Sequence, residues 1–212
     1  VPSPYAVILA MVDAAYRVGG EEKAFEVFTL LHRTRLYIKP PTYAVVTNTF
    51  VKVKRENRDK EKDPLNPYIT TINFREQVFF RGVLKIAFAV NGLSVKEINL
   101  LKLVASHINY FGKRSSFFQF SGVTILDKLE GYSIRVPDEL SFIDPTQYGI
   151  MQFLDELGEG KTEDLFCRIN TYSDNKMTLG KHRVLQEYLL PYKMVENSDS
   201  FTYYATSSGG LE

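Results

Sequence analysis

The predicted fold depends first on the stretch TTINFREQVFFRGVLKIAFAVNGLSVKE, residues 70–97. Two runs within it, 70–80 and 83–90, are rich in β-branched and aromatic residues and predict a pair of strands. Asn91-Gly92 is a turn signal that ends the second run. Ser94 and Glu97 then form a capping box, whose side chains satisfy free backbone N–H groups at the start of a helix. The stretch therefore predicts two strands followed by a helix that reaches about Asn109.

Outward from this stretch, further helices and strands are predicted on both sides. Ser3-Pro4 and Gly19-Gly20 bound an apolar run and predict a helix with an N-terminal cap and a glycine stop. Composition and spacing add a helix near 22–31 and strands at 35–39, 43–54, 118–126 and 132–136. The resulting order is helix, strand, hairpin, strand, helix, strand, which matches a ferredoxin-like βαββαβ unit that lacks its first strand.

These elements predict an α+β protein with two parts. Residues 1–136 form a ferredoxin-like (RRM-like) domain, and residues 137–212 form a mixed, β-rich C-terminal extension. In the extension we expect a helix near 146–157, a break at Gly158–Gly160 and a terminal strand near 201–205.

Composition excludes several classes of protein. The 212 residues are 44% hydrophobic and 24% charged, which is typical of an ordinary globular protein. Cys167 is the single cysteine, so we expect neither a disulfide scaffold nor a zinc ribbon, and a reducing cytoplasm fits best. The apolar run from Tyr5 to Val12 is too short to cross a bilayer, so no membrane span is expected. Neither a P-loop nor a dinucleotide-binding glycine motif occurs, so we expect no cofactor and no small-molecule substrate. No metal is expected, because Cys167 has no Cys or His companion at metal-ligand spacing.

The formal net charge of +1 gives no global attraction for nucleic acid, so RNA binding has to depend on where the basic residues lie. The segment from Lys52 to Lys62 holds six basic residues against three acidic ones. It is interpreted either as a flexible hairpin loop that grips RNA phosphates or as a solvated loop. Arg75 and Arg81 bracket an apolar strand and point either to a ligand or to solvent.

A second basic segment is Tyr110–Ser116, with the sequence YFGKRSS. Its glycine permits a close backbone approach, and its two cations and two hydroxyls suit adjacent phosphates. Neighbouring aromatics such as Phe111 and Phe118 either stack on unpaired bases or belong to the core. The predicted RNA-binding residues are Lys52, Lys54, Arg55, Arg58, Arg75, Arg81, Tyr110, Gly112, Lys113, Arg114, Ser115 and Ser116.

Three stretches carry a family resemblance: PSPYAVILAM at 2–11, NFREQVFFRGVLKIAF at 73–88, and YFGKRSS at 110–116. On these residues the chain resembles CRISPR-associated protein family five, the RAMP subunit of type I Cascade surveillance complexes. The resemblance covers about residues 1–121. It implies a non-catalytic subunit that holds the 5′ handle of a guide RNA, caps the backbone of repeated RAMP subunits and contacts the large subunit.

Two alternatives stay open from the residues. One subtype of that family cuts precursor guide RNA, and such metal-free cleavage needs a general base such as histidine; the candidates are His32, His107 and His182. The other alternative is a protein–protein scaffold without direct RNA contact. Catalytic residues are therefore left unassigned.

Overall fold

The structure is a computed structural model that describes residues 1–57, 64–136 and 149–206. The chain forms two compact units, each built from two separate parts of the sequence. The helical unit comprises Val1–Pro40 and Lys85–Pro191, and the hairpin unit comprises Pro41–Leu84 and Tyr192–Glu212. Both units therefore draw on residues from before and after position 136, where the sequence predicted a boundary.

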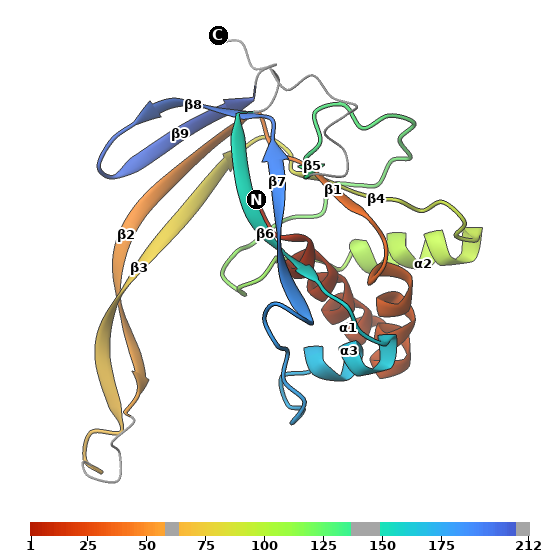
Figure 1. Cartoon of the computed structure of the whole chain (residues 1–212), viewed down its shortest axis with the longest axis horizontal. Coiled ribbons are helices and arrows are strands. Elements are labelled where there is room, and N and C mark those ends of the chain that lie inside the picture. The colour runs from red at the N-terminus through yellow and green to blue at the C-terminus, as the bar shows by residue number, and fades with distance from the viewer. Residues whose placement is uncertain (58–63, 137–148, 207–212) are drawn as a thin grey trace. The chain divides into compact units, whose positions relative to one another are not determined.

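The hairpin unit is a four-stranded antiparallel sheet in the order β3-β2-β9-β8. Its strands are β2 (Tyr43–Glu56), β3 (Tyr68–Arg81), β8 (Tyr192–Asn197) and β9 (Phe201–Thr206). Strands β2 and β3 pair without interruption, from Tyr43 opposite Arg81 to Glu56 opposite Tyr68. Figure 1 shows them as a long twisted ribbon.

Strand β9 covers only the first part of this ribbon. It pairs with residues 43–47 of β2, and one further backbone bond runs from the N–H of Asn48 to the carbonyl of Ser200 at 3.0 Å. The base of the sheet is held by Tyr192, whose buried hydroxyl donates to the carbonyl of Pro41 at 2.7 Å. Burial also raises the pKa of Tyr192, which favours its neutral form.

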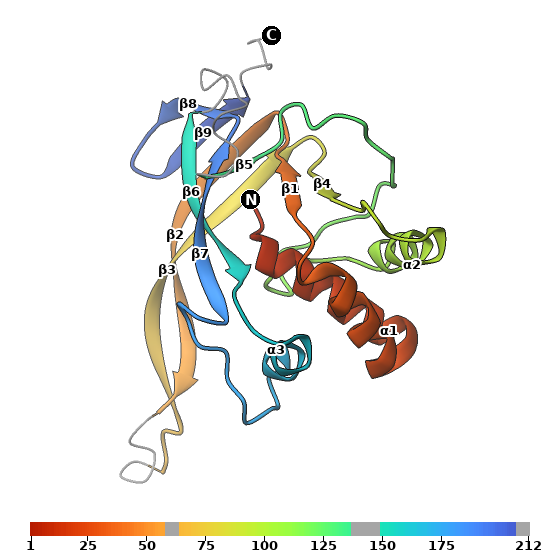
Figure 2. The ribbon, with the colours of Figure 1, turned by 45° about the vertical axis from the view of Figure 1, so that its right-hand side comes forward.

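The helical unit is organised around α1 (Pro4–Leu31). Ser3 caps this helix by accepting a hydrogen bond from the N–H of Ala6, and Gly19 and Gly20 break it with non-helical backbone angles. Helices α2 (Val95–Ala105) and α3 (Thr162–Ile169) pack on α1 (Figure 2). Apolar residues of all three helices, among them Phe28, Val104 and Leu165, form the hydrophobic core.

Two small sheets complete the helical unit. Strands β1 (Leu36–Lys39) and β4 (Lys85–Phe88) pair antiparallel, and β7 (Arg183–Leu190) lies between β5 (Ile134–Arg135) and β6 (Ile150–Leu157). Ser133 links the two sheets, because it exchanges hydrogen bonds with the backbone of Ile38.

The predicted α+β class is confirmed, as are several local features. The break in the first helix lies at Gly19-Gly20 as predicted. Ser94 and Glu97 form the complete capping box of α2, and strand β9 occupies the predicted terminal strand. None of the helices that the structure describes is both long and apolar enough to span a lipid bilayer.

The predicted pairing of strands 70–80 and 83–90 is wrong. Strand β3 pairs with β2, whereas β4 pairs with β1 across the inserted hairpin. Between β3 and β4 the chain turns at Gly82, whose φ of +117° lies in a region that favours glycine. The two runs therefore belong to different sheets.

Two further predicted elements are also wrong. Residues 118–126 form no strand, and the nearest bridge pairs Tyr110 with Phe117. Among the described residues, no strand lies beside 118–126 to pair with it. From 150 to 157 the predicted helix at 146–157 is strand β6, because β7 provides a pairing partner along the whole of this strand. Residues 146–148 lie outside the described part of the chain.

Candidate nucleic-acid interface

The β2–β3 ribbon has two faces with different chemistry. Successive residues of a strand point to opposite faces, and residues directly opposite each other share a face. The uninterrupted register therefore places Arg55, Arg75 and Arg81 together on one face, which we call the arginine face. Lys52 and Lys54 lie on the other, which we call the lysine face.

Charge distinguishes the two faces. On β2 and β3, all of whose residues are described, the arginine face has no acidic residue. The lysine face carries Glu56 and Glu76 beside its two lysines, so its formal charge is neutral. Neither Arg55 nor Arg75 forms an ion pair with another described residue. The arginine face therefore carries a net positive charge that can attract a polyanion.

Aromatic side chains accompany the arginines. The guanidinium carbon of Arg81 lies 5.7 Å from the ring centroid of Tyr43, whose ring is in turn 6.0 Å from that of Tyr203. Phe79 lies opposite Val45 on the same face and is 68% exposed. Phe201 joins them, because β9 pairs it with Thr47. The face therefore combines cations with rings on which bases can stack.

The lysine face has an aromatic pair of its own. The rings of Phe50 and Phe74 meet edge to face with centroids 5.4 Å apart, and they are 76% and 51% exposed. Because Glu56 and Glu76 balance the lysines there, this face has apolar surface but no net charge for phosphates.

The second predicted segment lies in the helical unit. Its backbone forms a tight turn: the N–H of Ser116 donates to Lys113 at 2.9 Å, and the N–H of Phe111 donates to Ser116 at 3.3 Å. Gly112 has a φ of +69°, and Phe111 packs edge to face on Phe118 at 4.9 Å. The turn exposes the segment Gly112, Lys113, Arg114, Ser115 and Ser116, whereas Tyr110 is half-buried.

The predicted site residues thus fall into separate groups. The turn at 110–116 and the hairpin residues belong to different units, and the hairpin residues divide between two faces. Lys52 and Lys54 lie in strand β2, which includes the predicted strand 43–54; Arg55, predicted beyond that strand, also lies in β2 because the ribbon continues to Glu56. Arg58 lies outside the described residues.

Sequence reasoning missed the aromatic members of the arginine face, which are Tyr43, Phe79, Phe201 and Tyr203. Tyr43 and Phe79 could have been assigned to this face from the alternation of side chains along strands 43–54 and 70–80, had the pairing of these two strands been known. The last two require the register of β9, which the sequence does not specify.

The three histidines contact backbone groups and, in one case, a threonine hydroxyl. His32 contacts the carbonyls of Phe28 and Thr29 and the hydroxyl of Thr162, and His107 contacts the carbonyl of Leu103. His182 is buried, and its Nδ1 accepts the N–H of Thr178 at 3.2 Å. Among the described residues, none of these contacts joins a histidine to another histidine or to a carboxylate.

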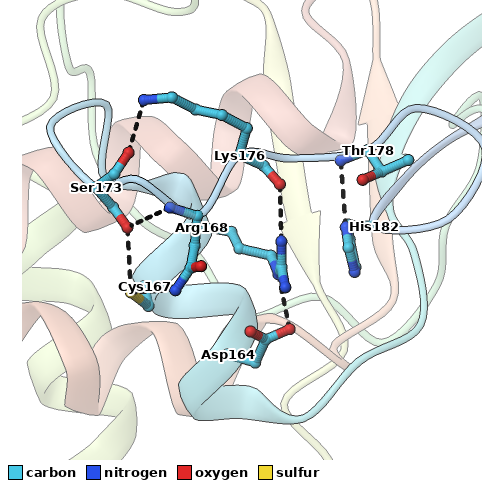
Figure 3. A network of polar contacts seen from close by, with 8 residues as sticks. Asp164, Cys167, Arg168, Ser173, Lys176, Thr178 and His182 are labelled. Atoms are coloured by element: carbon cyan, nitrogen blue, oxygen red, sulfur yellow. Dashed lines mark hydrogen bonds and ion pairs between the residues drawn. The ribbon is translucent and has the colours of Figure 1, made fainter.

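A polar network orders the chain after α3 (Figure 3). Arg168 donates to the carboxylate of Asp164 at 2.7 Å and to the carbonyl of Lys176 at 2.9 Å. Ser173 lies between Cys167 and Lys176, with its hydroxyl 3.3 Å from the Cys167 sulfur. Hydrogen bonds from Ser173 and then Asn175 lower the pKa of the exposed Cys167 thiol, because they stabilise the thiolate.

The lowered pKa of Cys167 predicts a measurable pH dependence. The rate of iodoacetamide alkylation should reach half its maximum at a lower pH than in an unstructured cysteine peptide, because the thiolate is the nucleophile. Ser173→Ala removes the larger stabilising bond and should move this midpoint upward, whereas Ser115→Ala in the distant turn should not. The same midpoint in the wild type and Ser173→Ala would contradict the assigned cause.

Among the described residues, no group of three or more His, Cys, Asp or Glu side chains is arranged to hold a metal ion. No family model matches the chain, and the comparison with curated proteins finds no match.

Proposed function

We propose that the chain is an RNA-binding subunit that holds single-stranded RNA on the arginine face of the hairpin unit. The observation that carries the proposal is the register of β2, β3 and β9, which gathers Arg55, Arg75 and Arg81 with four aromatic side chains on one face. Arginine forks bind phosphate oxygens, and aromatic rings stack on bases.

The spacing of the cations suits an extended strand. Arg55 lies opposite Ile69, Arg75 is six positions after Ile69, and Arg81 is six positions after Arg75. At the rise of a β-strand, each step is about 20 Å. A chain of phosphates laid along the ribbon would meet a cation at regular intervals. A duplex buries the faces of its bases, so the aromatic side chains favour a single strand.

We further propose that the RNA is the 5′ handle of a guide RNA in a type I CRISPR surveillance complex, with backbone RAMP subunits and the large subunit as protein partners. The residue resemblance at 2–11, 73–88 and 110–116 motivates this assignment. The order α1, β1, β4, α2 also supports a ferredoxin-like RAMP core, because β1 and β4 pair antiparallel between two helices. Residues 41–84 of the hairpin unit would then be an insertion between β1 and β4.

The test is fluorescence anisotropy with labelled single-stranded RNA across a salt series. If each arginine of the arginine face neutralises one phosphate, Arg55→Ala, Arg75→Ala and Arg81→Ala together should make the log–log salt slope shallower by about 2. A triple variant of the helical unit with Lys96→Ala, Lys102→Ala and Lys128→Ala removes the same charge and should leave the slope unchanged.

Two results would contradict the proposal. Binding that is absent or insensitive to salt in the wild type counts against RNA binding by this chain, and equal losses in both triple variants count against the arginine face. For the handle assignment, repeat-derived RNA with an intact 5′ end should bind tighter than a scrambled RNA of equal length. Equal affinity for these two RNAs would contradict the handle and leave single-strand binding in place.

A further inference from the structure

A groove of about 600 Å³ lies on the arginine face where β9 begins beside β2. The backbone hydrogen bond from Asn48 to Ser200 joins two of its lining residues. The volume falls within the range of small-ligand sites in proteins. Its lining residues are Val45, Thr47, Asn48, Thr49, Glu196, Ser200, Phe201 and Tyr203.

The groove combines aromatic walls with one charged group. Phe201 and Tyr203 provide ring surface. Glu196 is the one lining residue with a formal charge at neutral pH. Glu196 is exposed, and no hydrogen bond or ion pair joins it to another described residue. The hydroxyls of Thr47 and Thr49 already donate to carbonyls of β3, at 3.4 Å and 3.3 Å. No described residue therefore donates a hydrogen bond to the Glu196 carboxylate, which remains available to a ligand.

A carboxylate in this groove repels phosphate and favours a ligand group that presents two adjacent hydrogen-bond donors. An ionised carboxylate only accepts hydrogen bonds, and its two oxygens accept two parallel donors. Among the four RNA bases, guanine alone presents two adjacent N–H donors, N1 and the exocyclic N2, on its Watson–Crick edge. Adenine and cytosine place an acceptor beside their amino group, and uracil places its one donor between two acceptors.

We infer that this groove binds a single guanine base, stacked on Tyr203 or Phe201 and held at its Watson–Crick edge by the carboxylate of Glu196. The inference rests on the proposed function, since the arginines supply the attraction for the RNA backbone. Arg75 lies opposite Thr49, and Arg81 lies over Tyr43, so cations flank the groove on the same face. The phosphates of the bound strand can meet these arginines while the base occupies the groove.

The experiment uses labelled oligouridine of one length with a single central guanosine, inosine or adenosine in place of one uridine. Wild-type protein should bind the guanosine RNA about 10- to 100-fold tighter than plain oligouridine, the discrimination typical of a bidentate contact. Inosine lacks the exocyclic amine, so most of this preference should be lost with it. Glu196→Gln should abolish the preference and keep the affinity for oligouridine, whereas Glu76→Gln on the lysine face should change neither.

The outcomes separate this inference from the proposed function. Salt-sensitive binding with equal affinity for all four RNAs would overturn the guanine site and leave single-strand binding intact. Preference for adenosine over guanosine, or a preference that survives Glu196→Gln, would also overturn it. Failure of every RNA to bind would overturn the proposed function and this inference together. Because the comparison of guanosine with inosine uses wild-type protein, it does not depend on the folding of any variant.

Discussion

Alanine in place of Gly158 is expected to lower the free energy of unfolding by roughly 3 kcal/mol. A Cβ atom at this position would lie 1.9 Å from the carbonyl oxygen of Lys181 and 3.1 Å from Cγ1 of Val184. The backbone there is held on both sides, because Gly158 donates to the carbonyl of His182 and Glu159 donates to that of Lys181. The overlap is with backbone rather than with a flexible side chain, so relief requires these hydrogen bonds to break.

Gly180→Ala is the matched control for this substitution. Gly180 has a φ of +83°, and apart from its two chain neighbours no residue has a heavy atom within 4 Å of the position that its Cβ would occupy. Its replacement should therefore cost only the strain of a left-handed backbone, about 1 kcal/mol. Urea unfolding followed by circular dichroism measures both variants. A loss for Gly158→Ala no larger than that for Gly180→Ala would show that the close approach to Lys181 does not constrain the fold.

The features predicted correctly from sequence are those determined within a few residues. The Ser3 cap, the break at Gly19-Gly20 and the capping box of Ser94 and Glu97 each depend on neighbouring backbone groups. A local motif either satisfies those groups or does not, so the sequence suffices to predict it.

Strand pairing was predicted poorly because it depends on distant partners. Strand β4 pairs with β1 across the whole inserted hairpin, and β6 is a strand because β7 lies along it. Residues 150–157 have no local feature that excludes a helix, so the ladder with β7 decides their conformation. For the same reason residues 118–126, although rich in strand-forming types, form no strand without a neighbour.

In the candidate site too, local features could be predicted from the sequence, whereas features that depend on strand pairing could not. The basic residues of the hairpin were evident from composition, whereas the face that each one occupies follows only from an uninterrupted register. Lys52 and Lys54 were grouped with Arg55 by their closeness in sequence, yet they lie on the opposite side of the ribbon. Tyr203 joins Tyr43 from the other end of the chain, and only the pairing of β9 brings the two together.

Loss of stacking on the arginine face should weaken RNA binding without changing its salt dependence. Phe79→Ala together with Tyr203→Ala removes two rings, each of which contributes about 1–3 kcal/mol when a base stacks on it. The affinity for labelled oligouridine should therefore fall by roughly 100-fold. No charge is removed, so the slope of log affinity against log salt should stay that of the wild type.

The lysine face provides the control, since Phe50→Ala together with Phe74→Ala also removes two exposed rings from the hairpin unit. This pair should lower the affinity by less than about threefold, because the lysine face carries no net charge to hold the RNA there. Thermal unfolding of both double variants checks that the sheet is intact, which matters for Tyr203 because its ring packs near Tyr43. A larger loss from the lysine-face pair would place the RNA on the opposite side of the ribbon. Since the arginines would then point away from the bound strand, that result would contradict both the interface and the guanine groove.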